Sequence, residues 1–314
     1  MVTIKDIHQA RERISTIINE TPILSSSQLS NLCGNSMFFK AEHLQKTGAF
    51  KVRGATNKVM YAAAEGVSSV TAASSGNHGQ AVAYIANILG VPATIVVPED
   101  ANASKVSAIR SYNGSIETCG TTSDERIPRA EILAKENGGV FIPPYDDPLV
   151  IAGQGTVGLE ILEQLELVEA VVVPIGGGGL ISGILTAVKE IKPSVKIIGV
   201  EPVSANDTYL SLKNRQITSI QKTNTIADGL RTSQPGSLTF PIVEKYIDNV
   251  VLVSEDEISQ ALFFVLERMK QLIEPSSAVT VAAAMFDKLN MRDKNVVCVL
   301  SGGNVDLGKI GHMM

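Results

Sequence analysis

The sequence predicts an α/β protein of two domains, with mainly parallel sheets covered by helices. Strand-like apolar runs alternate with helix-like runs from about Gly54 onward, and such alternation implies parallel strands with helices on both faces. The chain has 314 residues, which is enough to bury a sizeable core and to form two domains. In sheets of this kind, ligands bind in the loops that follow the carboxyl ends of the strands.

The expected elements follow one another in strand–helix order. In the first half they are strands at 69–73, 93–97, 115–119 and 140–142, with helices at 77–89, 102–112 and 124–136. In the second half they are helices at 156–165, 180–185, 255–270 and 277–289, with strands at 170–175, 194–200, 249–253 and 295–300. The proline-containing segment 143–148 marks a crossing between domains. We therefore expect a large cofactor domain of residues 1–67 and 148–314, and a small mobile domain of residues 68–147.

Four consecutive glycines, Gly176, Gly177, Gly178 and Gly179, separate an expected strand from an expected helix. Glycine weakens both kinds of element, so four together indicate backbone amides that close around an anion at a helix N-terminus. The run is not a P-loop, because no lysine follows it until Lys189. A flexible turn and a dinucleotide-binding loop remain as alternatives.

Composition narrows the classes of partner. The net charge of −5 and the lack of a long basic run argue against nucleic acid and anionic membranes as partners. The N-terminus is charged where a signal peptide would be apolar, so we expect a cytoplasmic protein. Cys33, Cys119 and Cys298 are odd in number and far apart, which is typical of reduced cysteines.

Lys51 is the candidate nucleophile. It is flanked by small and apolar residues, and a desolvated lysine has a lowered pKa that frees its amine as a nucleophile or base. A single lysine is more often simply solvated. The interpretation of Lys51 therefore depends on the motifs around it.

Five motifs together resemble the fold-type II pyridoxal phosphate enzymes of the serine racemase and serine/threonine dehydratase family. This fold is tryptophan synthase β-like, with two domains. The motifs occur in family order and extend over most of the chain: TGAFKVRG at 47–54, SSGNHG at 74–79, GGGGL at 176–180, TIADG at 225–229 and SGGN at 301–304. One departure is Ala49, where many relatives have serine.

The resemblance implies a role for each cofactor-binding residue. Lys51 would hold pyridoxal 5′-phosphate as a Schiff base and later take the α-proton of the substrate. The glycine run with Leu180 would bind the phosphate, and Asn77 the ring's 3-hydroxyl. Ser301 would face the pyridine nitrogen and leave it essentially neutral, which suits β-elimination.

Ser75 bears on which reaction is expected. The resemblance implies a serine racemase with L-serine and L-threonine dehydratase (ammonia-lyase) activity, in which Lys51 and Ser75 act as opposed bases. If Ser75 merely fills space, the alternatives are a threonine or threo-3-hydroxyaspartate dehydratase without racemase activity, or a β-replacement synthase. The expected substrate-binding residues are Ser74, Ser75, Asn77, His78 and Arg126. We assign His78 no chemistry, and Arg126 has the alternative of an ordinary surface arginine.

Two further sites follow from the resemblance. Glu201, the carbonyl of Ala205 and Asp207 offer hard oxygen ligands for Mg²⁺, Ca²⁺ or Mn²⁺, with a solvated acidic loop as the alternative. ATP is a candidate effector at a homodimer interface. The positions that match an ATP site are Ser26, Ser27, Lys46, Thr47, Gln80, Tyr112, Lys270 and Asn304.

Overall fold

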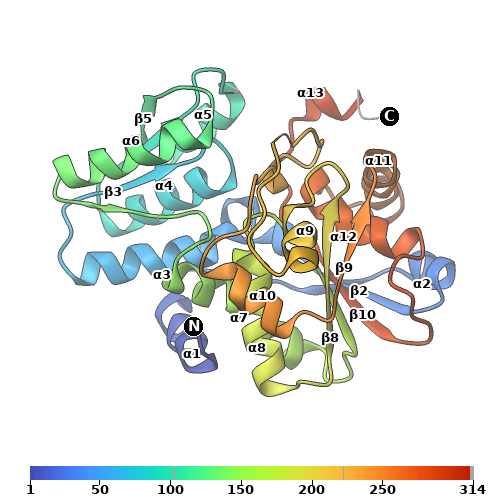
Figure 1. Ribbon diagram of the computed structural model, residues 1–314. Helices are drawn as coiled ribbons and strands as arrows, with labels where there is room; N and C mark the ends of the chain where they lie inside the picture. Colours follow the sequence, from blue (N-terminus) through green and yellow to red (C-terminus); the bar gives the residue numbers. More distant parts are fainter. Residues whose placement is uncertain (102, 222, 312–314) are drawn as a thin grey trace.

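The computed structural model describes residues 1–101, 103–221 and 223–311, and it contains two sheets that lie side by side (Figure 1). The larger sheet has the strand order β1-β2-β10-β7-β8-β9, and the smaller has the order β5-β4-β3-β6. All strand pairs are parallel except β1 with β2. The predicted α/β class is confirmed.

Helices cover both faces of the larger sheet because its strands are apolar on both sides. In β7, Val172 packs with the cluster beneath α11 and α12, while Val171 and Val173 pack with the cluster beneath α7 and α8. The strands are β1 (Ile23–Ser25), β2 (Ser36–Lys40), β7 (Ala170–Pro174), β8 (Lys196–Pro202), β9 (Asn249–Val253) and β10 (Asn295–Val299). The helices are α1 (Ile4–Ile14), α2 (Ser27–Cys33), α7 (Pro148–Gln164), α8 (Gly179–Ile191), α9 (Asp207–Asn214), α10 (Thr239–Tyr246), α11 (Glu255–Phe264), α12 (Pro275–Met285) and α13 (Leu307–Ile310).

The smaller sheet has its own core. Its strands are β3 (Val70–Ala73), β4 (Ala93–Val97), β5 (Ser115–Thr118) and β6 (Val140–Phe141), and its helices are α4 (Asn77–Leu89), α5 (Ala103–Ser111) and α6 (Ser123–Glu136). Helix α3 (Lys51–Ala64) packs against both α4 and α7 and so lies between the two sheets. Its residues Val52, Ala55 and Val59 belong to the core of the smaller sheet. The domain boundary at residue 67 stays a prediction.

Several elements differ from expectation at their ends. Helix α7 begins at Pro148, eight residues before the predicted start at 156, because Asp147 caps it by accepting hydrogen bonds from the amides of Leu149 and Val150. Helix α11 ends at Phe264, and a π-helical turn, η4 (Val265–Met269), continues it. The helix predicted from 102 is α5, and Asn102 itself lies outside the described residues.

The 3₁₀ turns η1 (Glu42–Leu44), η2 (Lys46–Gly48) and η3 (Asp228–Leu230) complete the structure. No helix within the described ranges is long and apolar enough to cross a membrane.

Candidate functional site

The segment that carries Lys51 is joined to the loop that carries Ser301. The amide of Phe50 donates to the carbonyl of Ser301 at 3.0 Å, and the amide of Gly303 donates to the carbonyl of Gly48 at 2.9 Å. An antiparallel bridge between Ala49 and Gly302 lies between these two bonds. The first and last of the five motifs are therefore held together.

Lys51 is the first residue of α3, and it is half-buried. Its Nζ donates to the carbonyl oxygen of Pro144 at 2.6 Å and lies 5.3 Å from the centre of the Phe50 ring. Burial lowers the pKa of Lys51 to about 8, although the charge of Glu274 partly opposes this. A fraction of the amine is therefore neutral near neutral pH, as a nucleophile or base requires.

The glycine run lies between β7 and α8, and its backbone leaves no room for side chains. A Cβ on Gly177 would lie 2.3 Å from the Tyr145 ring, and a Cβ on Gly178 would lie 2.8 Å from Oγ1 of Thr239. Gly178 also has a φ of 89°, a left-handed conformation that favours glycine. Thr239 Oγ1 donates to the carbonyl of Gly177 at 2.8 Å. Because the loop ends at the N-terminus of α8, it fits a phosphate group.

Tyr145 is a site residue that the sequence did not indicate. It belongs to segment 143–148, which was expected only as a domain crossing. This segment contacts Lys51 through Pro144 and covers Gly177 through Tyr145. The one feature of the sequence that could have indicated Tyr145 is the position of segment 143–148 between two parts of the chain that carry motifs.

Ser301 fits the role of a neutral partner for a ring nitrogen. It is 2% exposed, and its Oγ lies 3.2 Å from the Oγ of Ser277 in the first turn of α12. Ser277 Oγ in turn donates to the carbonyl of Gly302 at 2.6 Å. Ser301 thus has a hydroxyl neighbour, in contrast to the carboxylate that would keep a pyridine nitrogen protonated.

Asn77 is held by Glu274, which the sequence analysis missed. The Nδ2 of Asn77 donates to both carboxyl oxygens of Glu274 at 3.0 Å, and its Oδ1 accepts from Nδ2 of Asn304 at 2.9 Å. Glu274 is 4% exposed, and burial raises its pKa to about 7. The only sequence signal was an acid directly before Pro275, at the start of α12.

Ser74, Ser75 and His78 lie in the turn between β3 and α4. Ser74 Oγ accepts from the amide of Gly76 at 3.2 Å, and Ser75 is half-buried. His78 is buried, with Nε2 2.8 Å from the carbonyl oxygen of Ile142. Burial first, and then the charge of Lys51, lowers the pKa of His78 to about 3. A neutral, packed histidine agrees with the expectation that it does no chemistry.

Arg126 lies near the start of α6 and lacks a carboxylate partner among the described residues. Its Nη2 donates to Ser123 Oγ at 3.3 Å, whereas its Nε and Nη1 are buried with no hydrogen-bond partner. Burial lowers the pKa of Arg126. Buried guanidinium nitrogens without partners fit an anionic ligand.

Glu201 near the end of β8 and Asp207 at the start of α9 interact with each other, and their role as metal ligands stays a prediction. Glu201 accepts from the amides of Thr208 at 3.0 Å and Tyr209 at 2.8 Å, while Oδ2 of Asp207 has no partner among the described residues. Burial first, and then the charge of Asp207, raises the pKa of Glu201 to about 8, and burial raises the pKa of Asp207 to about 7. Ala205 is fully buried beside them. This donor set fits a hard divalent cation.

The positions that match an ATP site are spread over several elements. Ser26 and Ser27 line a cavity of about 300 Å³ with Arg268. Asn304 Nδ2 donates to the carbonyl of Thr47 at 2.7 Å, beside Lys46. Gln80 is buried in α4, and Tyr112 meets Tyr84 edge-on at 5.5 Å between ring centres. Lys270 follows η4, and its backbone has a left-handed conformation. The ATP site stays a prediction.

Comparisons with known proteins agree with this geometry. Residues 14–302 match the family described as pyridoxal-phosphate dependent enzyme. The serine racemase of Dictyostelium discoideum is 45% identical over 318 residues, covering 100% of this chain and 98% of the racemase. The L-threonine ammonia-lyase of Thermotoga maritima is 43% identical over 315 residues, covering 100% of this chain and 78% of the lyase. The structure of maize serine racemase has a TM-score of 0.95 at 39% identity, covering 99% of this chain and 96% of the other. The predicted resemblance is confirmed, and the chain belongs to the family of pyridoxal-phosphate dependent enzymes.

Proposed function

We propose that the protein is a serine racemase that also dehydrates L-serine and L-threonine to a 2-oxo acid and ammonia. The observation that carries this proposal is the half-buried amine of Lys51, whose pKa is lowered to about 8 and whose segment is bonded to the Ser301 loop. The similarity to proteins named serine racemase and L-threonine ammonia-lyase supports it.

Different residues would bind the cofactor, bind the substrate and move the α-proton. Bound pyridoxal phosphate supplies a sink for the electron pair of the substrate's Cα. The amides of the glycine run would hold the phosphate, Ser301 would hydrogen-bond the ring nitrogen, and the amine of Lys51 would hold the cofactor and then take the α-proton. The turn at Ser74 and the N-terminus of α4 would bind the substrate carboxylate.

Two outcomes are open once the α-proton has moved to Lys51. If the β-hydroxyl leaves as water, the product rearranges and is hydrolysed to a 2-oxo acid and ammonia. If Ser75 returns a proton to the other face of Cα, the configuration is inverted. One residue, Ser75, would therefore separate racemisation from dehydration.

Two variants test these assignments. Lys51→Ala is expected to lose both activities and the visible absorbance of the bound cofactor. Ser75→Ala is expected to form pyruvate from L-serine but to lose D-serine formation, measured by chiral chromatography. Ser111→Ala, on the surface end of α5, is the matched control and should change neither rate. D-serine formation by Ser75→Ala at the wild-type rate would contradict the two-base assignment.

Arg126 favours a second substrate, threo-3-hydroxyaspartate. Its two buried nitrogens without partners would suit the extra carboxylate of this amino acid. Arg126→Gln should then lower kcat/KM for threo-3-hydroxyaspartate by at least about tenfold more than for serine. An equal loss for both substrates would argue that Arg126 only stabilises α6.

We also propose that Glu201, Ala205 and Asp207 bind Mg²⁺ or a similar divalent cation, since Oδ2 of Asp207 is buried without a partner. ATP as an effector, a homodimer and a cytoplasmic location complete the proposal. The three free cysteines suit a reducing compartment. ATP titration of the activity and sedimentation of the purified protein test the first two.

A further inference from the structure

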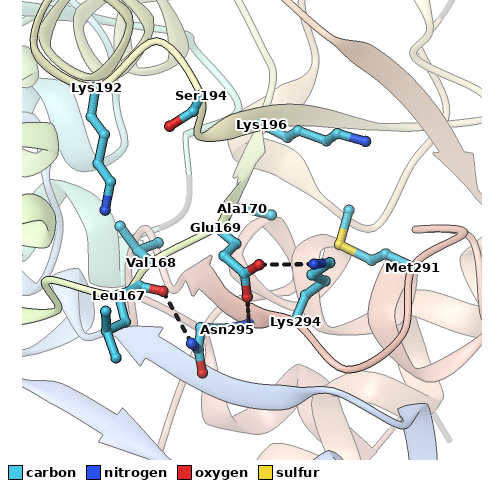
Figure 2. A pocket seen from close by; sticks show the side chains of 10 residues that line it. All are labelled: Leu167, Val168, Glu169, Ala170, Lys192, Ser194, Lys196, Met291, Lys294 and Asn295. Carbon is cyan, nitrogen blue, oxygen red and sulfur yellow. Dashed lines mark hydrogen bonds and ion pairs between the residues drawn. The ribbon is translucent and has the colours of Figure 1, made fainter.

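A cavity of about 500 Å³ opens at the edge of the larger sheet that is opposite the glycine run (Figure 2). It lies where β7, β8 and β10 begin, whereas the glycine run follows the end of β7. It is thus separated from the proposed catalytic site by the length of that strand. The lining residues are Leu167, Val168, Glu169, Ala170, Lys192, Ser194, Lys196, Met291, Lys294 and Asn295.

The rim of the cavity is positively charged. Three lysines, Lys192, Lys196 and Lys294, line it with one carboxylate, Glu169. Both oxygens of Glu169 are already engaged, one by Nζ of Lys294 at 2.9 Å and the other by the amide of Asn295 at 3.0 Å. Glu169 therefore pairs with Lys294 and acts on Lys192 only at longer range, so neither Lys192 nor Lys196 has an ion-pair partner in the part of the chain that the structure describes.

Hydrogen-bond donors remain available on this rim. Within the described residues, the ammonium of Lys196 and the hydroxyl of Ser194 have no hydrogen-bond or ion-pair partner, and both residues are exposed. Lys192 Nζ donates to the carbonyl of Glu166 at 2.6 Å, which occupies one of its three protons. Figure 2 shows Lys192 and Lys196 on two sides of the cavity, with Ser194 between them and the Lys294–Glu169 pair across from Ser194.

Apart from Asn295, the rest of the lining is apolar. Leu167 is 71% exposed, and Val168, Ala170 and Met291 lie with it along the cavity. A leucine this exposed beside a cavity of this size is suited to contact with an apolar group. An inorganic anion would use the lysines and leave these side chains uncovered.

We propose that this cavity binds a small organic anion, namely a carboxylate with an apolar body. The carboxylate would lie beside Lys192 and Ser194, and the apolar body would cover Leu167 and Met291. Lys196, whose side chain extends away from Lys192 in Figure 2, would add to the positive charge of the rim. The site is separate from the cofactor, the proposed metal site and the proposed ATP site. Because β7 leads from this cavity directly to the glycine run, a bound anion would contact the strand that supports the cofactor phosphate.

Calorimetric titration of the cofactor-loaded protein with decanoate tests the proposal, with decyltrimethylammonium and sulfate as comparison ligands. We expect saturable binding of one decanoate per chain, no comparable binding of the other two, and weaker binding at high salt. The double variant Lys192→Gln/Lys196→Gln should bind decanoate at least about tenfold more weakly. Leu167→Ser should also weaken it, because the apolar contact is lost.

The matched control is Lys5→Gln/Lys135→Gln, which removes the same charge from two exposed lysines elsewhere. It should bind decanoate like the wild type, and all variants should keep the wild-type melting temperature because the changed side chains lie at the surface. Absence of saturable binding, equal binding of decyltrimethylammonium, or equal losses in the two double variants would each overturn the proposal.

Discussion

The protein buries charged side chains at several places, and two of them near the larger sheet differ in whether the charges balance. The balanced cluster consists of Arg53, Lys40, Glu42 and Glu160. Arg53 contacts Glu42 at 2.7 Å and Glu160 at 2.5 Å, and Lys40 contacts Glu160 at 2.6 Å. The acidic pair consists of Glu201 and Asp207, and no cation pairs with either in the described chain.

The pKa values respond in opposite directions at the two places. Beside Arg53 and Lys40 the pKa of Glu160 is lowered despite its burial, and the carboxylates raise the pKa of Arg53. In the acidic pair, the pKa of Glu201 is raised to about 8 and that of Asp207 to about 7. The balanced cluster therefore needs no further ion, whereas the acidic pair is complete only with a proton or a cation.

Breaking the balanced cluster should have the largest effect. Arg53→Met leaves two buried carboxylates with only Lys40 beside them, so we expect the free energy of unfolding to fall by about 3–5 kcal/mol. Urea denaturation measures it. Arg292→Met is the control, because its pair with Asp287 is exposed and screened by water, so its loss should change stability far less. Equal losses in the two variants would contradict the distinction between buried and exposed pairs.

Supplying a cation to the acidic pair should stabilise the protein by a smaller amount. At pH 8, Mg²⁺ at one hundred times its dissociation constant should raise the free energy of unfolding by about 2.7 kcal/mol. Asp207→Asn should abolish this response, and Asp293→Asn, which changes an exposed acid, should retain it. An unchanged Mg²⁺ response in Asp207→Asn would place the cation elsewhere.

The acidic pair should also give a pH dependence in the metal-free protein. Between about pH 4.5 and 7 the folded state keeps protons on Glu201 and Asp207 that the unfolded state has released, so stability falls as pH rises, by up to about 1.4 kcal/mol per pH unit for each group. Thermal unfolding in chelator measures this slope. It should be shallower in Asp207→Asn, and a wild-type slope in that variant would show that other groups, such as Glu274, account for it.

The smallest effect on stability is expected for an exposed ion pair between α5, which packs with the smaller sheet, and the turn η3. Lys105 of α5 contacts Asp228 of η3, and both side chains are partly exposed, at 26% and 41%. Lys105→Gln should change the free energy of unfolding by less than about 1 kcal/mol in chemical denaturation, because water screens the pair. A loss close to that of Arg53→Met would show that exposure does not separate the two kinds of pair.

The sequence could indicate those parts of the candidate site that lie in short loops after strands. It placed the run Gly176–179 between a strand and a helix, and the structure has it between β7 and α8. The role of the run stays a prediction. Single residues that depend on three-dimensional neighbours were not predicted. Glu274 belongs to the candidate site because it binds the side chain of Asn77, and Tyr145 because it packs on the glycine run. No sequence pattern predicts either contact.

Some details of the fold could not be predicted for a similar reason. The short strand β1 has only three residues, too few to show a period of two, and it was not predicted; no helix or strand was predicted before Gly54. The predicted start of α7 was too late because the sequence of its first two turns is uncharged and looks like a continuation of the proline-containing loop before it. The place of β10 between β2 and β7 follows from packing across the whole chain.

That place of β10 has a consequence for the order in which the protein is made. All four strands of the smaller sheet lie between residues 70 and 141, so they leave the ribosome before any of β7 to β10. In the larger sheet, β2 reaches β7 only through β10, the last strand of the chain. The segment that carries Lys51 is likewise bonded to residues 301–303. A nascent chain that stops short of residue 295 therefore lacks both the strand that joins β2 to β7 and the loop that is bonded to the segment of Lys51, so neither arrangement can form before synthesis is nearly complete.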